Sequence, residues 1–407
     1  MRGLRFTVVA LAAWALTRCA VMFWWAFTPY GGAAATDLYR YAHFATEGAS
    51  SGLFPWEYPA LARMALGSSL GLDISGYATV YLLLMLTFDL AFTIWLVRPR
   101  QQKRSPAGVW LWIATVPLLG VIPYTRYDMV VACIVALAVS WSGGRPRVAA
   151  LLLSVAMALK LWPLLLLPLL VMRAQPSERR RVLAAGLAPW MAFELVGYLM
   201  WGARSLTAPW AWQRERGLQI ESVIVGPLRL LHPGADPIEF RFNAWETTSP
   251  GWLLAILAFV GLALVAAVLM ASCRQLTQPR LPNRQADQIV ASAAVLTIGI
   301  LILTGKVFSP QYILWLIAPL AVSYAATKSR DVWLFALLAA TCAATTYVYP
   351  VLYSQLIAGD ALSWSVLQAR NLLVILVVAV LVSRWRESLG MSHWRTSEPL
   401  RESEVTA

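Results

Sequence analysis

Two acidic residues early in the chain are of a type that could deprotonate a hydroxyl group. Asp37 stands in the segment Thr36-Asp37-Leu38-Tyr39, and Glu57 directly precedes Tyr58. A carboxylate held beside an acceptor hydroxyl can act as a general base. Each acid also has an ordinary explanation, because Asp favours helix caps and Glu57 could be a solvated loop charge. The residues alone leave the base open between Asp37 and Glu57.

Three basic residues in other polar segments could bind an anion. Lys160 lies between two apolar half-runs, where a charge is costly and needs either an acid or an anionic ligand. Arg126 could contact a ligand or simply pair with the nearby Asp128. Lys306 stands next to Ser309-Pro310-Gln311-Tyr312, where the proline is expected to start a helix whose free N–H groups suit a phosphate. A phosphate is the ligand that these cations would share.

Signatures of nucleotide and metal sites are missing from the sequence. There is no Walker A, G-x-G-x-x-G or H-E-x-x-H pattern, and the three histidines lie far apart. The four cysteines have no paired spacing and do not indicate a disulfide framework. We therefore expect no metal site and no cofactor.

The composition shows what kind of chain must position these residues. Of 407 residues, 59% are hydrophobic and only 13% are charged, whereas an ordinary soluble domain has roughly 25% charged residues. These values exclude a soluble globular enzyme, a disordered protein and a fibrous one. Apolar runs of the length that crosses a bilayer recur throughout. They cover approximately 6–27, 74–97, 108–122, 129–142, 148–172, 182–203, 251–272, 288–304, 312–327, 331–351 and 366–383.

One run cannot be a single straight span. Arginines stand on both sides of 148–172, and Pro163 and Pro168 interrupt it. The pattern predicts two short helices that meet near Lys160, which brings the total to 11 or 12 membrane segments. We therefore predict an all-α polytopic integral membrane protein.

The distribution of charge predicts the orientation. With the N-terminus in the cytoplasm, most of the 33 lysines and arginines fall on the cytoplasmic side, so the net charge of +13 follows the positive-inside rule. The excess is therefore no evidence for nucleic acid as a partner. Residues 1–383 are expected to form one membrane domain with outer loops 28–73 and 204–250, and 384–407 to form a polar cytoplasmic tail.

Other charged residues have less specific interpretations. Arg18, Asp89 and Glu194 lie within predicted spans and are expected to form structural pairs. The stretch Trp210–Arg216, with Glu221, suggests an amphipathic helix on the membrane surface. We hypothesise that this helix closes over the site and shapes the binding of the acceptor.

Five outer segments carry recognisable patterns: T-D-x-Y at 36–39, E-Y-P-A-L at 57–61, R-Y-D at 126–128, A-L-K-L-W-P-L at 158–164 and G-K-V-F-S-P-Q-Y-I-L-W-L at 305–316. They resemble motifs of the GT-C glycosyltransferases, and most closely those of glycosyltransferase family 87, the actinobacterial mannosyltransferases that use polyprenyl-phosphate-mannose. The pattern at 305–316 is the most specific of the five. Many GT-C enzymes carry two acids in D-x-D or E-x-D in the first loop, whereas this chain has Tyr39 at the second position. The resemblance implies a GT-C fold and an inverting sugar transfer on the outer face of the cytoplasmic membrane.

The resemblance also implies roles for individual residues. Asp37 would be the base, and Lys306, Lys160 and Arg126 would contact the phosphate of the donor. The substrate cavity would be lined by Tyr39, Arg40, Glu57, Tyr58, Asp128, Ser309, Gln311 and Tyr312. The expected partners are a polyprenyl-phosphate-sugar donor, a lipid or glycolipid acceptor and membrane lipids. Mannose is the expected sugar, while an arabinosyl- or glucosyltransferase with the same donor type, a lipid-linked sugar transporter or flippase, and a non-catalytic scaffold stay open as alternatives.

Overall fold

The structure, a computed structural model, describes residues 2–47, 56–98, 105–231, 237–247, 251–327 and 332–390. The predicted tail lies outside the described residues from position 391 onward, and so does part of the first outer loop, 48–55.

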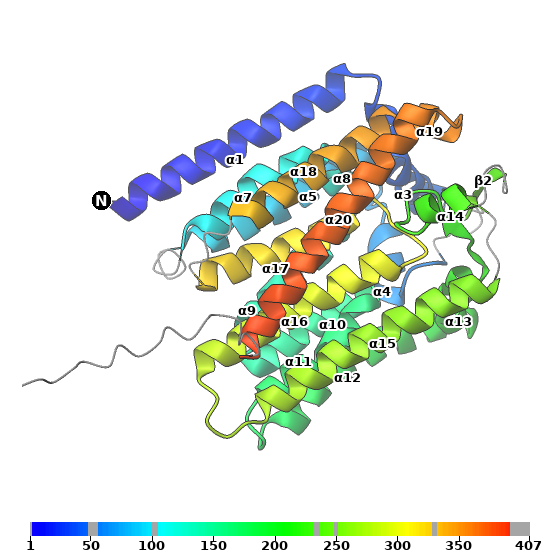
Figure 1. Ribbon diagram of the computed structural model, residues 1–407. Helices are drawn as coiled ribbons and strands as arrows, with labels where there is room; N and C mark the ends of the chain where they lie inside the picture. The colour runs from blue at the N-terminus through cyan, green and yellow to red at the C-terminus, as the bar shows by residue number, and fades with distance from the viewer. Residues whose placement is uncertain are drawn as a thin grey trace, which may run out of the picture.

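Long apolar helices dominate the molecule, which is an all-α polytopic membrane protein as predicted (Figure 1). In the described part of the chain, seven helices are long and apolar enough to cross a membrane. They are α1 (Arg2–Phe27), α5 (Ile74–Val97), α12 (Arg179–Trp201), α15 (Gly251–Leu276), α16 (Asn283–Thr304), α18 (Val332–Thr346) with its continuation η4 (Tyr347–Val351), and α20 (Ala361–Ser388).

Shorter apolar helices occupy the remaining predicted runs. They are α7 (Ala107–Thr115) with η2 (Val116–Leu119), α9 (Asp128–Trp141), α10 (Pro146–Leu159), η3 (Trp162–Leu166) with α11 (Leu167–Arg173), and α17 (Tyr312–Thr327). Helices α10 and α17 both pack on α9, and α10 also packs on α12. The helices most enclosed by protein are therefore the short ones and α16, while α1, α12 and α15 present most of their surface outward.

The predicted break at Lys160 is confirmed. Helix α10 ends at Leu159, and Lys160 has an extended backbone with φ −152° and ψ 131°. Pro163 and Pro168 then stand in the first turns of η3 and α11, where the missing N–H of proline is tolerated. Helices η3 and α11 therefore run back from the bend in the direction opposite to α10. The bend itself places the Lys160 side chain between the helices.

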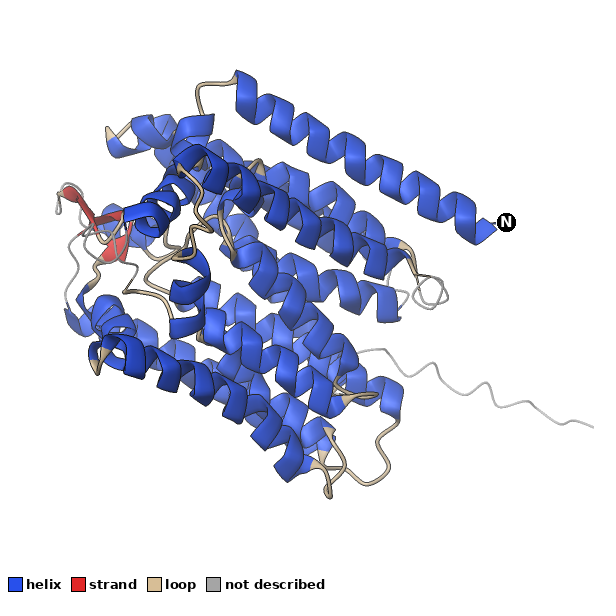
Figure 2. Ribbon diagram, turned by 180° about the vertical axis from the view of Figure 1, so that it is seen from behind, coloured by secondary structure: helices blue, strands red, loops and turns tan. Residues whose placement is uncertain are grey.

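Short elements gather at one end of the bundle, and the N-terminus lies at the other end (Figures 1 and 2). Among the described residues, the remaining short helices are α2 (Gly31–Ala34), α3 (Thr36–Glu47), α4 (Ala60–Leu66), α8 (Ile122–Thr125), α13 (Arg204–Glu215), α14 (Val225–Leu231) and α19 (Tyr353–Ile357). Within 204–250, which the sequence left unassigned beyond one helix, β1 (Leu218–Gln219), β2 (Ile238–Arg241) and β3 (Ala244–Thr247) form a small antiparallel sheet in the order β1-β3-β2. This end of the molecule holds the polar segments singled out above.

A buried ion pair joins the first two long helices. Arg18 of α1 donates to Asp89 of α5 through Nε at 2.8 Å and Nη2 at 3.2 Å. Asp89 also accepts from Trp112 Nε1 and Tyr124 Oη, both at 2.7 Å. The prediction of a structural pair is confirmed for Arg18 and Asp89, because all the acceptor capacity of the carboxylate is used within the bundle.

Glu194, the third charge within the spans, is placed differently. It has no ion pair among the described residues, and its Oε1 lies 3.5 Å from the Ala60 main-chain N. Three residues further along α12, Gly197 lets this helix approach α4, because a Cβ there would lie 2.5 Å from Ala60 Cβ. The close contact fixes the segment that carries Glu57 and Tyr58 against α12.

Candidate active site

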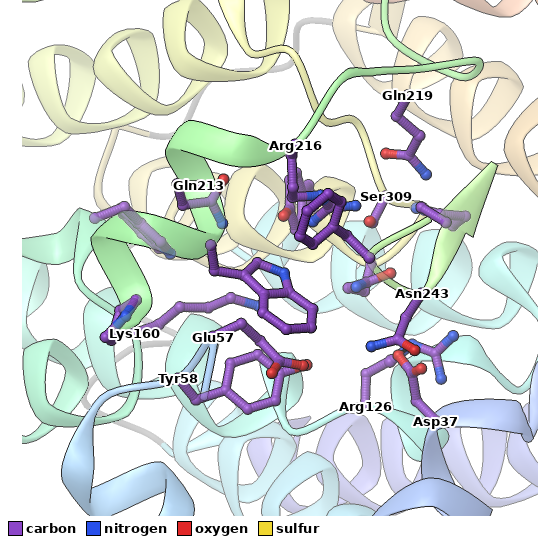
Figure 3. A pocket seen from close by; sticks show the side chains of 18 of the residues that line it. Asp37, Glu57, Tyr58, Arg126, Lys160, Gln213, Arg216, Gln219, Asn243 and Ser309 are labelled. Atoms are coloured by element: carbon purple, nitrogen blue, oxygen red, sulfur yellow. Dashed lines mark ion pairs between the residues drawn. The ribbon is translucent and has the colours of Figure 1, made fainter. Parts of the chain in front are cut away.

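A cavity of about 770 Å³ opens at the end of the bundle where the short elements gather (Figure 3). Its wall is built from the start of α3, the segment before α4, Arg126 between α8 and α9, the bend at Lys160, part of α12, residues within 206–221 and 240–245, the 309–312 segment, and η4 with α19. The predicted site residues that line it are Asp37, Arg40, Glu57, Tyr58, Arg126, Lys160, Ser309, Gln311 and Tyr312. Segments that are distant in sequence thus converge on one cavity.

Asp37 and Arg126 form an ion pair at the cavity wall. Asp37 lies in the first turn of α3, and its Oδ2 is 2.8 Å from Arg126 Nε. The Asp37 side chain is 20% exposed, whereas that of Arg126 is 9% exposed. Arg126 Nε and Nη1 are buried without a well-oriented hydrogen-bond partner in the described part of the chain. Because Nε faces Asp37, Nη1 is the donor that is left without a partner among the described residues.

The electrostatics of Arg126 reflect its surroundings. Burial opposes its charged form, but Asp37 and the neighbouring tyrosines outweigh that effect and raise the pKa of Arg126 above its ordinary value. The guanidinium is thus a permanent cation beside the Asp37 carboxylate.

Arg40 and Glu57 form a second ion pair on the same wall. Burial opposes the charged form of Arg40, while Glu57 raises its pKa, and the net effect is an increase. The Glu57 side chain is 9% exposed, and its Oε2 is buried without a hydrogen-bond partner among the described residues. Glu57 is therefore less accessible than Asp37.

Lys160 has an acid partner and an aromatic enclosure. Its Nζ donates to Asp128 Oδ1 at 2.6 Å, and the same oxygen accepts from Trp315 Nε1 at 2.7 Å. The ammonium also lies 5.1 Å from the ring centroids of Tyr127 and Trp315. Asp128 is itself 1% exposed and does not line the cavity. The alternative in which Arg126 pairs with Asp128 is wrong, because Arg126 faces Asp37 and Asp128 neutralises Lys160.

Lys306 and Tyr39 are not at the cavity wall. The Lys306 ammonium donates to the main-chain carbonyl of Arg216 at 2.7 Å, and its pKa is lowered, first by burial and then by the Arg216 charge. Tyr39 points outward from α3 and is 47% exposed. Pro310 does not open the following helix either, since α17 begins at Tyr312.

The 204–247 region supplies the part of the wall that sequence motifs did not reveal. Helix α13 covers the stretch where an amphipathic helix was predicted, and Trp210 on it is 63% exposed. Glu221 is not part of that helix as supposed but is buried at the cavity wall, 2% exposed. Additional polar residues from this region also line the cavity: Gln213, Arg216, Gln219 and Asn243. These residues belong to no recognised motif. The one sequence feature that could have pointed to them is a segment rich in polar and aromatic residues between two predicted spans.

A model of glycosyltransferase family 87 matches residues 56–303, which is more than half of the chain. No curated protein matches the chain, and no solved structure does. The matched region includes Glu57, Arg126 and Lys160 of the cavity, together with the whole of 204–247. The chain belongs to glycosyltransferase family 87.

Proposed function

We propose that this glycosyltransferase moves a sugar, mannose by its resemblance, from a polyprenyl-phosphate donor to a hydroxyl group of a lipid or glycolipid acceptor. The observation that carries the proposal is the pairing of a partly exposed carboxylate, Asp37, with the buried guanidinium of Arg126 on one cavity wall. The two groups provide a proton acceptor and an anion-binding group side by side, which is what transfer from a sugar phosphate requires.

The proposed step is a direct displacement. The Asp37 carboxylate takes the proton of the acceptor hydroxyl, whose oxygen forms a bond to the anomeric carbon of the sugar. The bond from that carbon to the phosphate oxygen breaks, and polyprenyl phosphate leaves with the electron pair. One bond forms and one breaks on opposite faces, so the configuration at the anomeric carbon inverts.

Charge at the leaving group rises during this step, and fixed cations can stabilise it. Arg126 offers its buried Nη1, which has no hydrogen-bond partner among the described residues, while its Nε faces Asp37 at 2.8 Å. Lys160 adds a second positive charge at the wall, although Asp128 partly offsets it. Preorganised donors of this kind stabilise developing charge better than water does, because they need no reorganisation. Lys306 is not assigned this role, because its ammonium is bound to Arg216 away from the wall.

Asp37 is the better candidate for the base, because its side chain is more exposed to the cavity than that of Glu57. The Asp37 side chain has more than twice the exposed fraction of Glu57, 20% against 9%. Glu57 is held by Arg40, and one of its oxygens is buried away from solvent. An acceptor hydroxyl can therefore reach the Asp37 carboxylate more readily.

The orientation in the membrane supports an outer-face site. The arginines at 98, 145, 147, 173, 179–181 and 274 lie at helix ends away from the cavity, where α5, α11 and α15 end and α10 and α12 begin. By the positive-inside rule that end is cytoplasmic. The cavity is then at the outer face of the cytoplasmic membrane.

The test uses membranes that contain the full chain, radiolabelled polyprenyl-phosphate-mannose and an actinobacterial lipid extract. Wild type is compared with Asp37→Asn and with Asp73→Asn, an exposed cap of α5 on the same outer segment whose capping role asparagine retains. We expect labelled glycolipid from wild type and Asp73→Asn and none from Asp37→Asn. Equal transfer by Asp37→Asn refutes the base assignment. Absence of transfer by wild type with mannose, arabinose and glucose donors alike refutes the sugar transfer and favours a transporter.

A further inference from the structure

Glu221 is a buried acid at the cavity wall that the proposed mechanism does not use. It follows β1 and is 2% exposed. Its Oε2 accepts hydrogen bonds from Gln219 Nε2 at 2.6 Å and from Tyr353 Oη at 3.2 Å. Its Oε1 accepts no hydrogen bond from any residue that the structure describes. One oxygen is thus fixed by the protein, and the other is left for a ligand in the cavity.

Two acids that line the cavity, Glu221 and Glu194, have no salt bridge among the described residues, and of the two only Glu221 is fully buried. Asp37, Glu57 and Asp128 each have a cation within 4 Å, whereas Glu221 has none among the described residues. Arg370 comes close, but its Nη2 donates to the main-chain carbonyl of Glu221 at 2.7 Å rather than to the carboxylate. A buried carboxyl group without a cation is costly unless hydrogen bonds satisfy it. An acid of this kind at the wall of the cavity therefore indicates a ligand that can hydrogen-bond to it.

Burial raises the pKa of Glu221 to about 7, against the opposing effects of Arg370, Tyr353 and Gln219. The carboxyl group therefore exists in both protonation states near neutral pH. A phosphate would be repelled by the ionised form, and a cation would lose its attraction to the neutral form. A hydroxyl group suits both, because it can donate to a carboxylate and accept from a carboxylic acid.

The position of Glu221 also fits a sugar. The Arg126 charge that pairs with Asp37 acts on Glu221 as well, and Arg126 and Glu221 line the same cavity. A sugar attached to a phosphate at Arg126 would then have its ring hydroxyls within this part of the cavity. We propose that Glu221 binds a sugar hydroxyl of the substrate through Oε1, and that Gln219 and Tyr353 are positioning residues for its carboxyl group. This inference rests on the proposed function.

Binding of the purified full chain to two probes tests the proposal without relying on turnover. The probes are a short-chain polyprenyl phosphate that carries mannose and the same lipid phosphate without the sugar. We expect Glu221→Ala to weaken binding of the mannosyl lipid roughly tenfold or more, the size expected for a lost hydrogen bond to a charged group. The sugar-free lipid should bind Glu221→Ala as it binds wild type. Glu239→Gln, which removes an exposed acid from β2 of the same region, is the matched control and should change neither affinity.

A second arm separates a donor sugar from an acceptor sugar. If Glu221→Ala leaves both lipid affinities unchanged but raises the KM for a glycolipid acceptor, the hydroxyl belongs to the acceptor. If neither the affinities nor that KM changes, the inference is overturned while the transferase activity stands. If wild type binds neither lipid phosphate, the proposed function fails first, and the inference falls with it.

Tyr353→Phe guards against a misfolded alanine variant, because it keeps the ring and removes only the hydroxyl group. We expect it to weaken binding of the mannosyl lipid and to spare the sugar-free lipid, with a smaller effect than Glu221→Ala. The effect should disappear in the Glu221→Ala background, because the two residues act on one contact. If Tyr353→Phe and Glu221→Ala weaken the binding of both lipids equally, and if the two losses add in the double variant, the residues have only a structural role. That result would overturn the assignment of Glu221 to a sugar hydroxyl.

Discussion

The Lys306 ammonium donates a hydrogen bond to the main-chain carbonyl of Arg216 at 2.7 Å, which joins the segment before α17 to the residue that directly follows α13. Two further bonds support this junction, from the Gln219 main-chain N to the Lys306 carbonyl and from the Phe308 main-chain N to Gln219 Oε1, both at 2.9 Å. The most specific motif of the sequence thus holds the wall of the site in place.

Replacing Lys306 should therefore lower the stability of the protein, with only a small effect on its affinity for a phosphate. We expect Lys306→Gln to lower the thermal midpoint of the purified protein, because a hydrogen bond from a charged group contributes about 1.5–3 kcal/mol. Affinity for a short-chain polyprenyl phosphate should fall less than in Arg126→Gln. Arg214→Gln, which removes an exposed charge from α13, controls for charge loss. A large loss of affinity with an unchanged midpoint would make Lys306 a phosphate contact instead.

The two candidate bases should respond differently to loss of charge. Asp37→Asn should lower kcat by about 10²–10⁴-fold, the usual contribution of a general base. Glu57→Gln should chiefly lower stability, because it leaves Arg40 buried without its counterion. Its kcat should fall less than that of Asp37→Asn. Parallel measurement of kcat and of thermal midpoints checks this, and the reversed pattern would make Glu57 the base.

Much of the fold was predictable because the bilayer imposes it. Apolar runs, prolines and flanking arginines identified the helices and the break at Lys160, since a spanning segment must satisfy its own backbone hydrogen bonds. The small sheet of 218–247 was not predicted. Its strands have only two to four residues, too few for an alternating pattern to stand out.

The site was predictable only where charge had to be neutralised. An intramembrane cation at Lys160 indicated an acid partner or an anionic ligand, but the choice of Asp128 depends on how α9 packs beside the bend. Sequence proximity favoured pairing of Arg126 with Asp128 and failed, because Asp37 approaches from another segment. Glu221 had no such signal, because its partners Tyr353 and Gln219 are uncharged.

The buried pair of Arg18 and Asp89 offers a test of the bundle itself. Arg18→Met should destabilise the protein by about 3–5 kcal/mol, because it leaves Asp89 charged and buried. Arg18→Met combined with Asp89→Leu should cost less than the sum of the single changes. Thermal unfolding of the four proteins in one detergent gives the double-mutant cycle. Additive losses would show that the pair is not coupled.

The stability of the protein should carry a pH dependence from Glu221. Its folded pKa of about 7 lies above the ordinary value of 4.5, so the folded carboxyl group holds its proton more tightly than the unfolded one. Stability from this group is therefore fully present below about pH 4.5 and is lost as the pH rises through 7. Glu221→Gln lacks this titration, so its thermal midpoint relative to wild type should rise between pH 5 and pH 8. Glu239→Gln, the exposed control, should show a constant difference over the same range. A Glu221→Gln difference that stays constant, or that falls as the pH rises, would mean that the carboxyl group is already ionised in the folded protein at pH 5 and would contradict this prediction.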